Sequence, residues 1–188
     1  MNKSLREAAK KLENMLLEIP SLVDGFSNFR FEAVSRWSQW LKQTETIFLN
    51  YGFVESADLA GIRAALLVTE IDPSMTRAMR KKIQLSRSLS SIQQVQLLIT
   101  SKYKSLNEKL EQVRMLIKQI LIPAQAAGMI HEPNGTGFNI YLEGLLHQFQ
   151  RHEQLGPSIN NAIAMVGKFD VLRILAEEIE FTEIEQAR

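Results

Sequence analysis

The stretch that decides the fold is MTRAMRKKIQLSRSLSSIQQVQLLITSKYKSLNEKLEQVRMLIKQILIPAQAA, residues 75–127. Alternating steps of three and four residues meet sixteen positions in it, of which fourteen are nonpolar. They are Met75, Ala78, Lys82, Leu85, Leu89, Ile92, Gln96, Ile99, Tyr103, Leu106, Leu110, Val113, Ile117, Ile120, Ala124 and Ala127. A repeat of about 3.5 residues sustained this long is typical of coiled coils. Residues 73–122 therefore predict a long heptad helix around which the fold is organised.

Four serines, at positions 86, 88, 90 and 91, interrupt this pattern with residues that are poor in helix interiors. Ser90 and Gln93 also have the spacing of a capping box, which marks the start of a helix. Residues 73–122 are consequently either one continuous helix or a pair of helices that turns near 88–91.

The first part of the chain, residues 1–71, predicts further helices. Ser4 and Glu7 have capping-box spacing, and the apolar stripe that follows ends at Pro20. A second, aromatic-rich helix follows the Asp24-Gly25 turn and ends at Gly52, and a third covers about 56–71. We interpret the aromatic residues as packed core and not as a cofactor pocket, because they recur at helical spacing.

The last part, residues 123–188, is turn-rich at first. Residues 133–137 read Pro-Asn-Gly-Thr-Gly, which predicts a loop or a small β-hairpin near 129–142. Two helices should follow, over about 139–154 and from 158 to about 181. The sequence thus predicts an all-α protein, a single domain over 1–188 that forms an elongated, coiled-coil-like helical bundle.

Composition excludes several classes of protein. The chain has 188 residues, of which 45% are hydrophobic and 23% charged, so it can form a core and is not intrinsically disordered. The absence of cysteine excludes disulfides and thiolate sites. The most apolar stretch, 115–130, is interrupted by Lys118 and falls short of the roughly 18 apolar residues of a membrane span. No signal-peptide core follows the N-terminus, and we expect a cytoplasmic protein without membrane contact.

Catalytic chemistry has no signature in this sequence. Its three histidines form no His-Glu-x-x-His motif, and no phosphate loop or nucleophile elbow is present. We therefore expect a protein that is not an enzyme and has no catalytic residues, cofactor or metal. The weaker alternative is a metal-dependent enzyme built from His131, Glu143 and His147.

The distribution of charge is more informative than any motif. Residues 73–107 contain seven basic and no acidic side chains, or +7, whereas residues 123–188 contain four basic and nine acidic ones, or −5. The candidate surface for an acidic partner or for nucleic acid consists of Arg77, Arg80, Lys81, Arg87, Lys102 and Lys104. The alternative is an ordinary solvated helix face, which the acidic C-terminal helix of this chain or of a second copy could neutralise.

These features favour binding over catalysis. A long heptad seam is buried only when comparably long helices cover it, either from the same chain or from another. We therefore expect a non-catalytic interaction or scaffold subunit that works through helix–helix assembly, as a homo-oligomer or with a partner protein. The alternative is a nucleic-acid-associated subunit that binds the phosphate backbone through the basic residues of 73–107.

Overall fold

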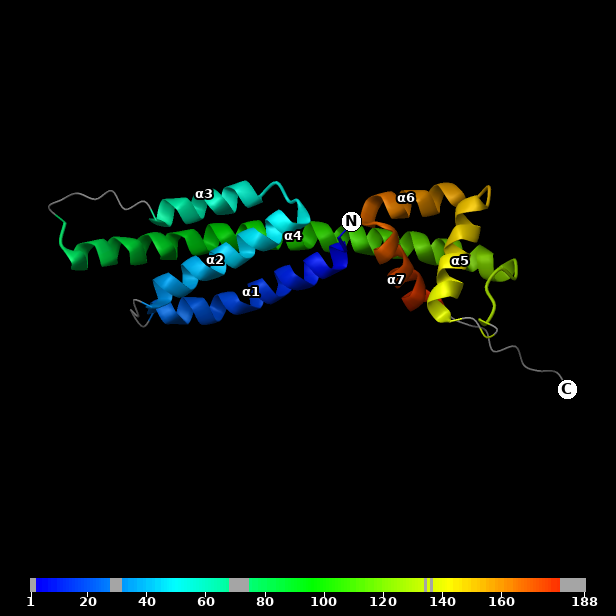
Figure 1. Cartoon of the computed structure of the whole chain (residues 1–188), viewed down its shortest axis with the longest axis horizontal. Coiled ribbons are helices and arrows are strands. Elements are labelled where there is room, and N and C mark those ends of the chain that lie inside the picture. Colours follow the sequence, from blue (N-terminus) through cyan, green and yellow to red (C-terminus); the bar gives the residue numbers. More distant parts are fainter. Residues whose placement is uncertain (1–2, 28–31, 68–74, 134, 136, 180–188) are drawn as a thin grey trace. The chain divides into compact units, whose positions relative to one another are not determined.

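The computed structural model describes residues 3–27, 32–67, 75–133, 135 and 137–179. These residues form seven α-helices and contain no β-strand, which confirms the all-α prediction (Figure 1). They divide into two compact units, an N-terminal unit of Glu7–Ser105 and a C-terminal unit of Leu106–Arg188 together with Met1–Arg6. Helix α1 (Leu5–Ser27) and helix α4 (Arg77–Ala126) contribute residues to both units.

Helix α1 is longer than its sequence predicts. The predicted end at Pro20 is wrong, because the helix continues through this residue to Ser27. A proline inside a helix removes one hydrogen bond and costs about 3 kcal/mol or more. Pro20 itself is exposed, but Leu22 and Phe26 beyond it are buried. The burial of these two side chains offsets the cost of the proline and holds the last turns in helical form.

Helix α2 (Glu32–Tyr51) carries the aromatic core of the N-terminal unit. Trp37 and Trp40 are almost fully buried and stack with their ring centroids 4.9 Å apart. Gly52 ends the helix with φ = 70°, a left-handed conformation that glycine adopts without strain. The amides of Gly52 and Phe53 donate to the carbonyls of Leu49 and Phe48, so the helix ends in a Schellman motif.

Helix α3 (Ser56–Leu67) packs against α2. The ion pair between Arg63 Nε and Glu45 Oε2, at 2.6 Å, joins the two helices. The predicted end of this helix at about residue 71 lies outside the described residues.

Helix α4 is a single helix of 50 residues, so the segment 88–91 does not break it. Two of the serines there satisfy their hydroxyls within the helix: Ser90 donates to the carbonyl of Arg87 and Ser91 to that of Ser88, whereas the buried hydroxyl of Ser88 has no hydrogen-bond partner. From Ile99 to Ala124 the predicted heptad positions are buried, apart from Tyr103, which is half-buried.

The first half of α4 turns a different face inward than the heptad pattern predicts. Ile92 is buried as the pattern predicts, but Leu89 is 43% exposed and Gln96 is exposed, whereas Ser88, Ser91 and Val95 are buried. The Oγ of Ser91 accepts a hydrogen bond of 3.0 Å from the indole N–H of Trp37. Packing against this large side chain therefore favours small residues at the helix surface, and the buried stripe shifts toward the serines.

The C-terminal unit contains three shorter helices: α5 (Phe138–Arg151), α6 (Gly156–Val166) and α7 (Lys168–Glu178), which pack on one another. The described residues of 129–142 form no strand, and the last of them already belong to α5, which argues against the hairpin alternative there. The single helix predicted from 158 to about 181 is two helices. Gly167 separates them with φ = 87° and ψ = 154°, a conformation essentially restricted to glycine.

Gly156 provides a test of this packing. A Cβ atom at this position would lie 2.6 Å from the carbonyl oxygen of Gln150, so Gly156→Ala must displace backbone. We expect it to lower the free energy of unfolding by roughly 1–3 kcal/mol. Gly144→Ala is the matched control, because that position has no neighbour within 4 Å and should gain about 0.4–1 kcal/mol. Urea denaturation followed by circular dichroism measures both, and equal stability of the two variants would contradict the close approach.

Candidate functional site

The six candidate basic residues all lie on α4, but they do not form one patch. Arg77, Arg80, Lys81 and Arg87 lie within the first three turns of the helix. At a rise of about 1.5 Å per residue, Lys102 and Lys104 lie more than ~20 Å farther along. The charge count of the sequence therefore combines two separate groups of cations.

Lys102 is neutralised within the N-terminal unit. Its ammonium lies 2.7 Å from Oε1 of Glu55 and 4.6 Å from the ring centroid of Phe53. Burial raises the pKa of the Glu55 carboxyl, whereas the hydrogen bond and the charge of Lys102 lower it. The lowering effects together are larger, so the pKa lies below its ordinary value. This ion pair makes Lys102 a structural residue and removes it from the candidate surface, whereas Lys104 is exposed.

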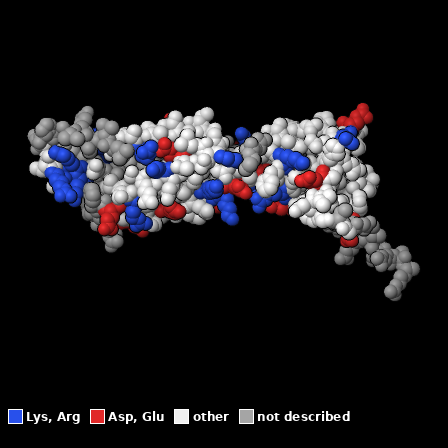
Figure 2. All heavy atoms as spheres, viewed as in Figure 1, with Lys and Arg blue, Asp and Glu red and all other residues white. Residues whose placement is uncertain are grey.

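The remaining cations gather at the beginning of α4, where Figure 2 shows a cluster of Lys and Arg side chains. Arg77 and Lys82 are exposed, and the first turn contains no acidic residue. Arg80 is half-buried and donates a hydrogen bond of 3.2 Å to the carbonyl of Met75. Arg87 lines a cavity of about 470 Å³ between α3 and α4. The positive end of the helix dipole adds to the positive potential of these cations, so the cluster attracts anions.

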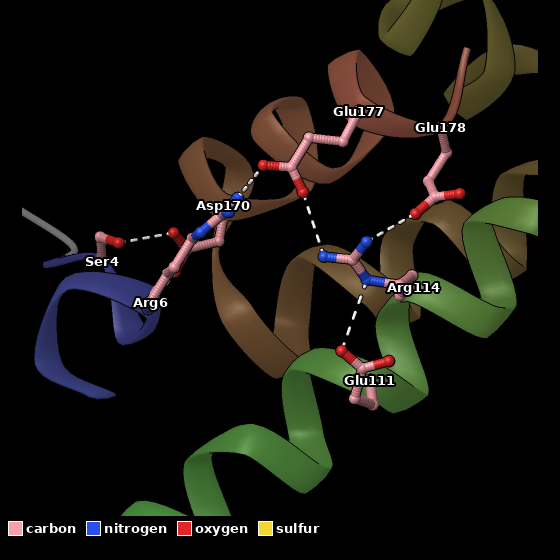
Figure 3. Close-up of polar contacts among 7 residues, drawn as sticks. All are labelled: Ser4, Arg6, Glu111, Arg114, Asp170, Glu177 and Glu178. Atoms are coloured by element: carbon pink, nitrogen blue, oxygen red, sulfur yellow. Dashed lines mark hydrogen bonds and ion pairs between the residues drawn. The ribbon is translucent and has the colours of Figure 1, made fainter. Parts of the chain in front are cut away.

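The described acidic residues at the C-terminal end pair with other cations. The guanidinium of Arg114 lies 3.0 Å from Glu177 Oε2 and 2.7 Å from Glu178 Oε1, and Arg6 also pairs with Glu177 (Figure 3). Lys118 contacts Glu178 at 3.2 Å. These two glutamates are thus engaged within the C-terminal unit by cations outside 73–107, and the acids at positions 180, 183 and 185 lie outside the described residues.

The ion pairs of Glu177 change its titration. Burial raises the pKa of this carboxyl, whereas hydrogen bonds and charge from Arg6 and Arg114 lower it. The lowering effects together are larger, so the pKa lies below the ordinary value of 4.5. Since the folded state holds the carboxylate more strongly than the unfolded state does, the pairs stabilise the fold above that value. Their contribution is lost as the pH falls through the lowered pKa.

Asp170 holds the beginning of α1 within the same unit. Its carboxylate is 1% exposed and accepts a hydrogen bond of 2.6 Å from the Ser4 hydroxyl (Figure 3). It also accepts one of 2.6 Å from the Leu5 amide and a longer one of 3.4 Å from the Arg6 amide. The first amides of a helix have no partner inside the helix. Asp170, a residue of α7, therefore caps α1 from a distant part of the chain, and its negative charge lies at the positive end of the helix dipole.

The histidines give little support to a metal site. Glu143 and His147 are exposed on α5, and His131 lies in the preceding loop, where its ring forms a T-shaped pair with the ring of Tyr141. Within the described part of the chain, no three His, Asp or Glu side chains are placed to hold a metal ion. The described helices also include none long and apolar enough to span a membrane.

The middle of α4 has a feature that the charge count overlooked. Residues 88–101 contain no charged side chain, although several of them point outward. Leu97 is 63% exposed, Leu89 is 43% exposed, and Gln93 and Gln96 are exposed between and beside them. The absence of charge in 88–101 can be seen in the sequence alone. Which of these residues face outward depends on how α4 is rotated against the helices it packs on.

Comparisons with protein-family models, curated proteins and solved structures find no significant match to this chain.

The cap at the start of α1 leads to a stability prediction. Asp170→Ala leaves the Ser4 hydroxyl and the amides of Leu5 and Arg6 without their acceptor, so we expect a loss of roughly 1–3 kcal/mol in the free energy of unfolding. Ser4→Ala removes only one donor and should cost less. Urea denaturation of the two variants measures the difference, and an Asp170→Ala protein as stable as the original chain would contradict the capping role.

Proposed function

We propose that this chain is a non-catalytic interaction subunit that acts through helix–helix assembly, with coiled-coil-like packing on α4, either with itself or with a partner protein. The observation that supports the proposal is the charge-free segment 88–101, which exposes Leu89 and Leu97 on the outer side of a long helix. Its length is about 20 Å at ~1.5 Å per residue.

A charge-free outer face lowers solubility and allows non-specific contact, and its presence is explained if the face is covered in an interface. Surface helices keep charged residues on their outer side, which favours solubility and discourages non-specific contact. Depletion of charge is instead typical of the centre of protein interfaces. Covering a largely exposed leucine such as Leu97 contributes about 1–2 kcal/mol, since full burial of such a side chain contributes about 1.5–3 kcal/mol.

A second candidate function is binding to the phosphate backbone of nucleic acid through the beginning of α4. The observation in its favour is the cluster of Arg77, Arg80, Lys81 and Lys82 without an acid in the first turn. The pairing of Lys102 with Glu55 and the separation of Lys104 from this cluster make the basic surface smaller than the sequence predicts. We therefore rank this function second.

Site-specific photo-crosslinking tests the two functions together. We expect benzoylphenylalanine at Leu97, in cells that normally make the protein, to give a discrete covalent adduct with a protein, because the outer face of α4 is covered there. The same residue at Lys42, which is exposed on α2, is the matched control and should give none.

The outcomes separate the proposals. An adduct at Leu97 whose added mass is protein, either a second copy of 21.4 kDa or another chain, supports assembly through α4. No adduct at positions 89, 93 and 97 would contradict it. An adduct at Arg77 that nuclease removes, with none at Leu97, would favour the second candidate.

A further inference from the structure

An exposed stripe runs along the outer face of α4 within the N-terminal unit. Its members follow one another at intervals of three, four or seven residues, so they share one face of the helix. They are Lys82, Ser86, Leu89, Gln93, Leu97 and Lys104, and each of them is exposed. From the first lysine to the second is 104 − 82 = 22 residues, or about 33 Å along a helix.

The charges of this outer stripe have a simple pattern. Its centre is uncharged, and a lysine stands at each end. Neither Lys82 nor Lys104 forms an ion pair with a described residue. Residues 73–107 contain no acidic residue, and the first acid beyond them along the helix is Glu108, four residues after Lys104. The outer stripe is therefore complementary to a surface with an uncharged centre and negative ends.

The outer stripe of a second copy is not such a surface. If two copies paired their outer stripes in parallel over the full length, Lys82 would face Lys82 and Lys104 would face Lys104. In an antiparallel pair centred on Gln93, Lys82 of each copy would face Lys104 of the other. Both arrangements place like charges opposite each other at both ends, which weakens association. A helix with acidic residues at these positions would instead form two ion pairs.

We propose that the outer stripe binds an amphipathic helix of a different protein, with an uncharged, partly apolar centre and acidic residues about 22 positions apart. This inference rests on the proposed function, because it names the kind of partner for assembly through α4. The lysines supply orientation and selectivity, while contact with Leu89 and Leu97 supplies most of the burial. Attraction between the exposed charges weakens as salt is added.

Two synthetic helical peptides test the inference on the full chain. Both carry the same uncharged face of Leu, Ala and Gln, and they differ only at two positions 22 residues apart, which are Glu in the acid-ended peptide and Lys in the lysine-ended one. Fluorescence anisotropy at low salt should show that the acid-ended peptide binds roughly tenfold more tightly or better. The difference should shrink at high salt.

Charge-reversal variants show where the peptide binds. Lys82→Glu with Lys104→Glu should reverse the preference, so that the lysine-ended peptide binds more tightly. The matched control is Lys10→Glu with Lys42→Glu, which changes the net charge equally at exposed positions of α1 and α2 and should keep the original preference. Circular dichroism verifies that both variants are folded.

Several results would overturn the inference. Equal binding of the two peptides, binding of neither, or reversal of the preference by the control variant would each do so. A crosslinked adduct at Leu97 with the mass of a second copy would also overturn it while leaving assembly through α4 intact. Failure of the proposed function is distinguished by the absence of any adduct at 89, 93 and 97.

Discussion

The burial of one face of α4 is the constraint on which both units depend. This helix is 50 residues long and includes a serine-rich segment whose intrinsic helix propensity is low. Contacts from distant parts of the chain support it, such as the hydrogen bond from Trp37 to Ser91 in the N-terminal unit. In the C-terminal unit, Arg114 on α4 is held by two glutamates of α7. Most helical stability in proteins comes from such packing rather than from propensity.

Periodicity predicted the helical class and the buried face of α4 from Ile99 to Ala124, because the spacing of apolar residues reports which side meets the core. It failed earlier in the helix, where the indole of Trp37 lies against Ser91. The pattern of residues around Ser91 does not show that Trp37, 54 residues earlier in the chain, packs against this part of the helix. Local rules also failed at Pro20, where burial of the residues beyond it outweighs the cost of a proline within a helix.

At the candidate site, too, some features can be predicted from the local sequence and others depend on contacts between distant residues. The excess of basic residues in 73–107 is visible in the sequence, but a count along the chain does not reveal that Lys102 meets Glu55. The absence of charge in 88–101 is equally visible in the sequence. The outward position of Leu97 and the inward position of Val95 follow only from how α4 is rotated against its neighbours. A function based on assembly therefore depends on packing as much as on composition.

The distance between residues 82 and 104 tests this account most directly, because it decides whether α4 is continuous through 88–91 and presents one outer face. The chain has no cysteine, so two introduced cysteines carry spin labels at unique positions. Electron–electron double resonance should give one narrow distance distribution near ~33 Å, the length of 22 residues of α-helix. A broad distribution, or one centred below roughly 25 Å as in a pair of helices that turns at the serines, would contradict the account.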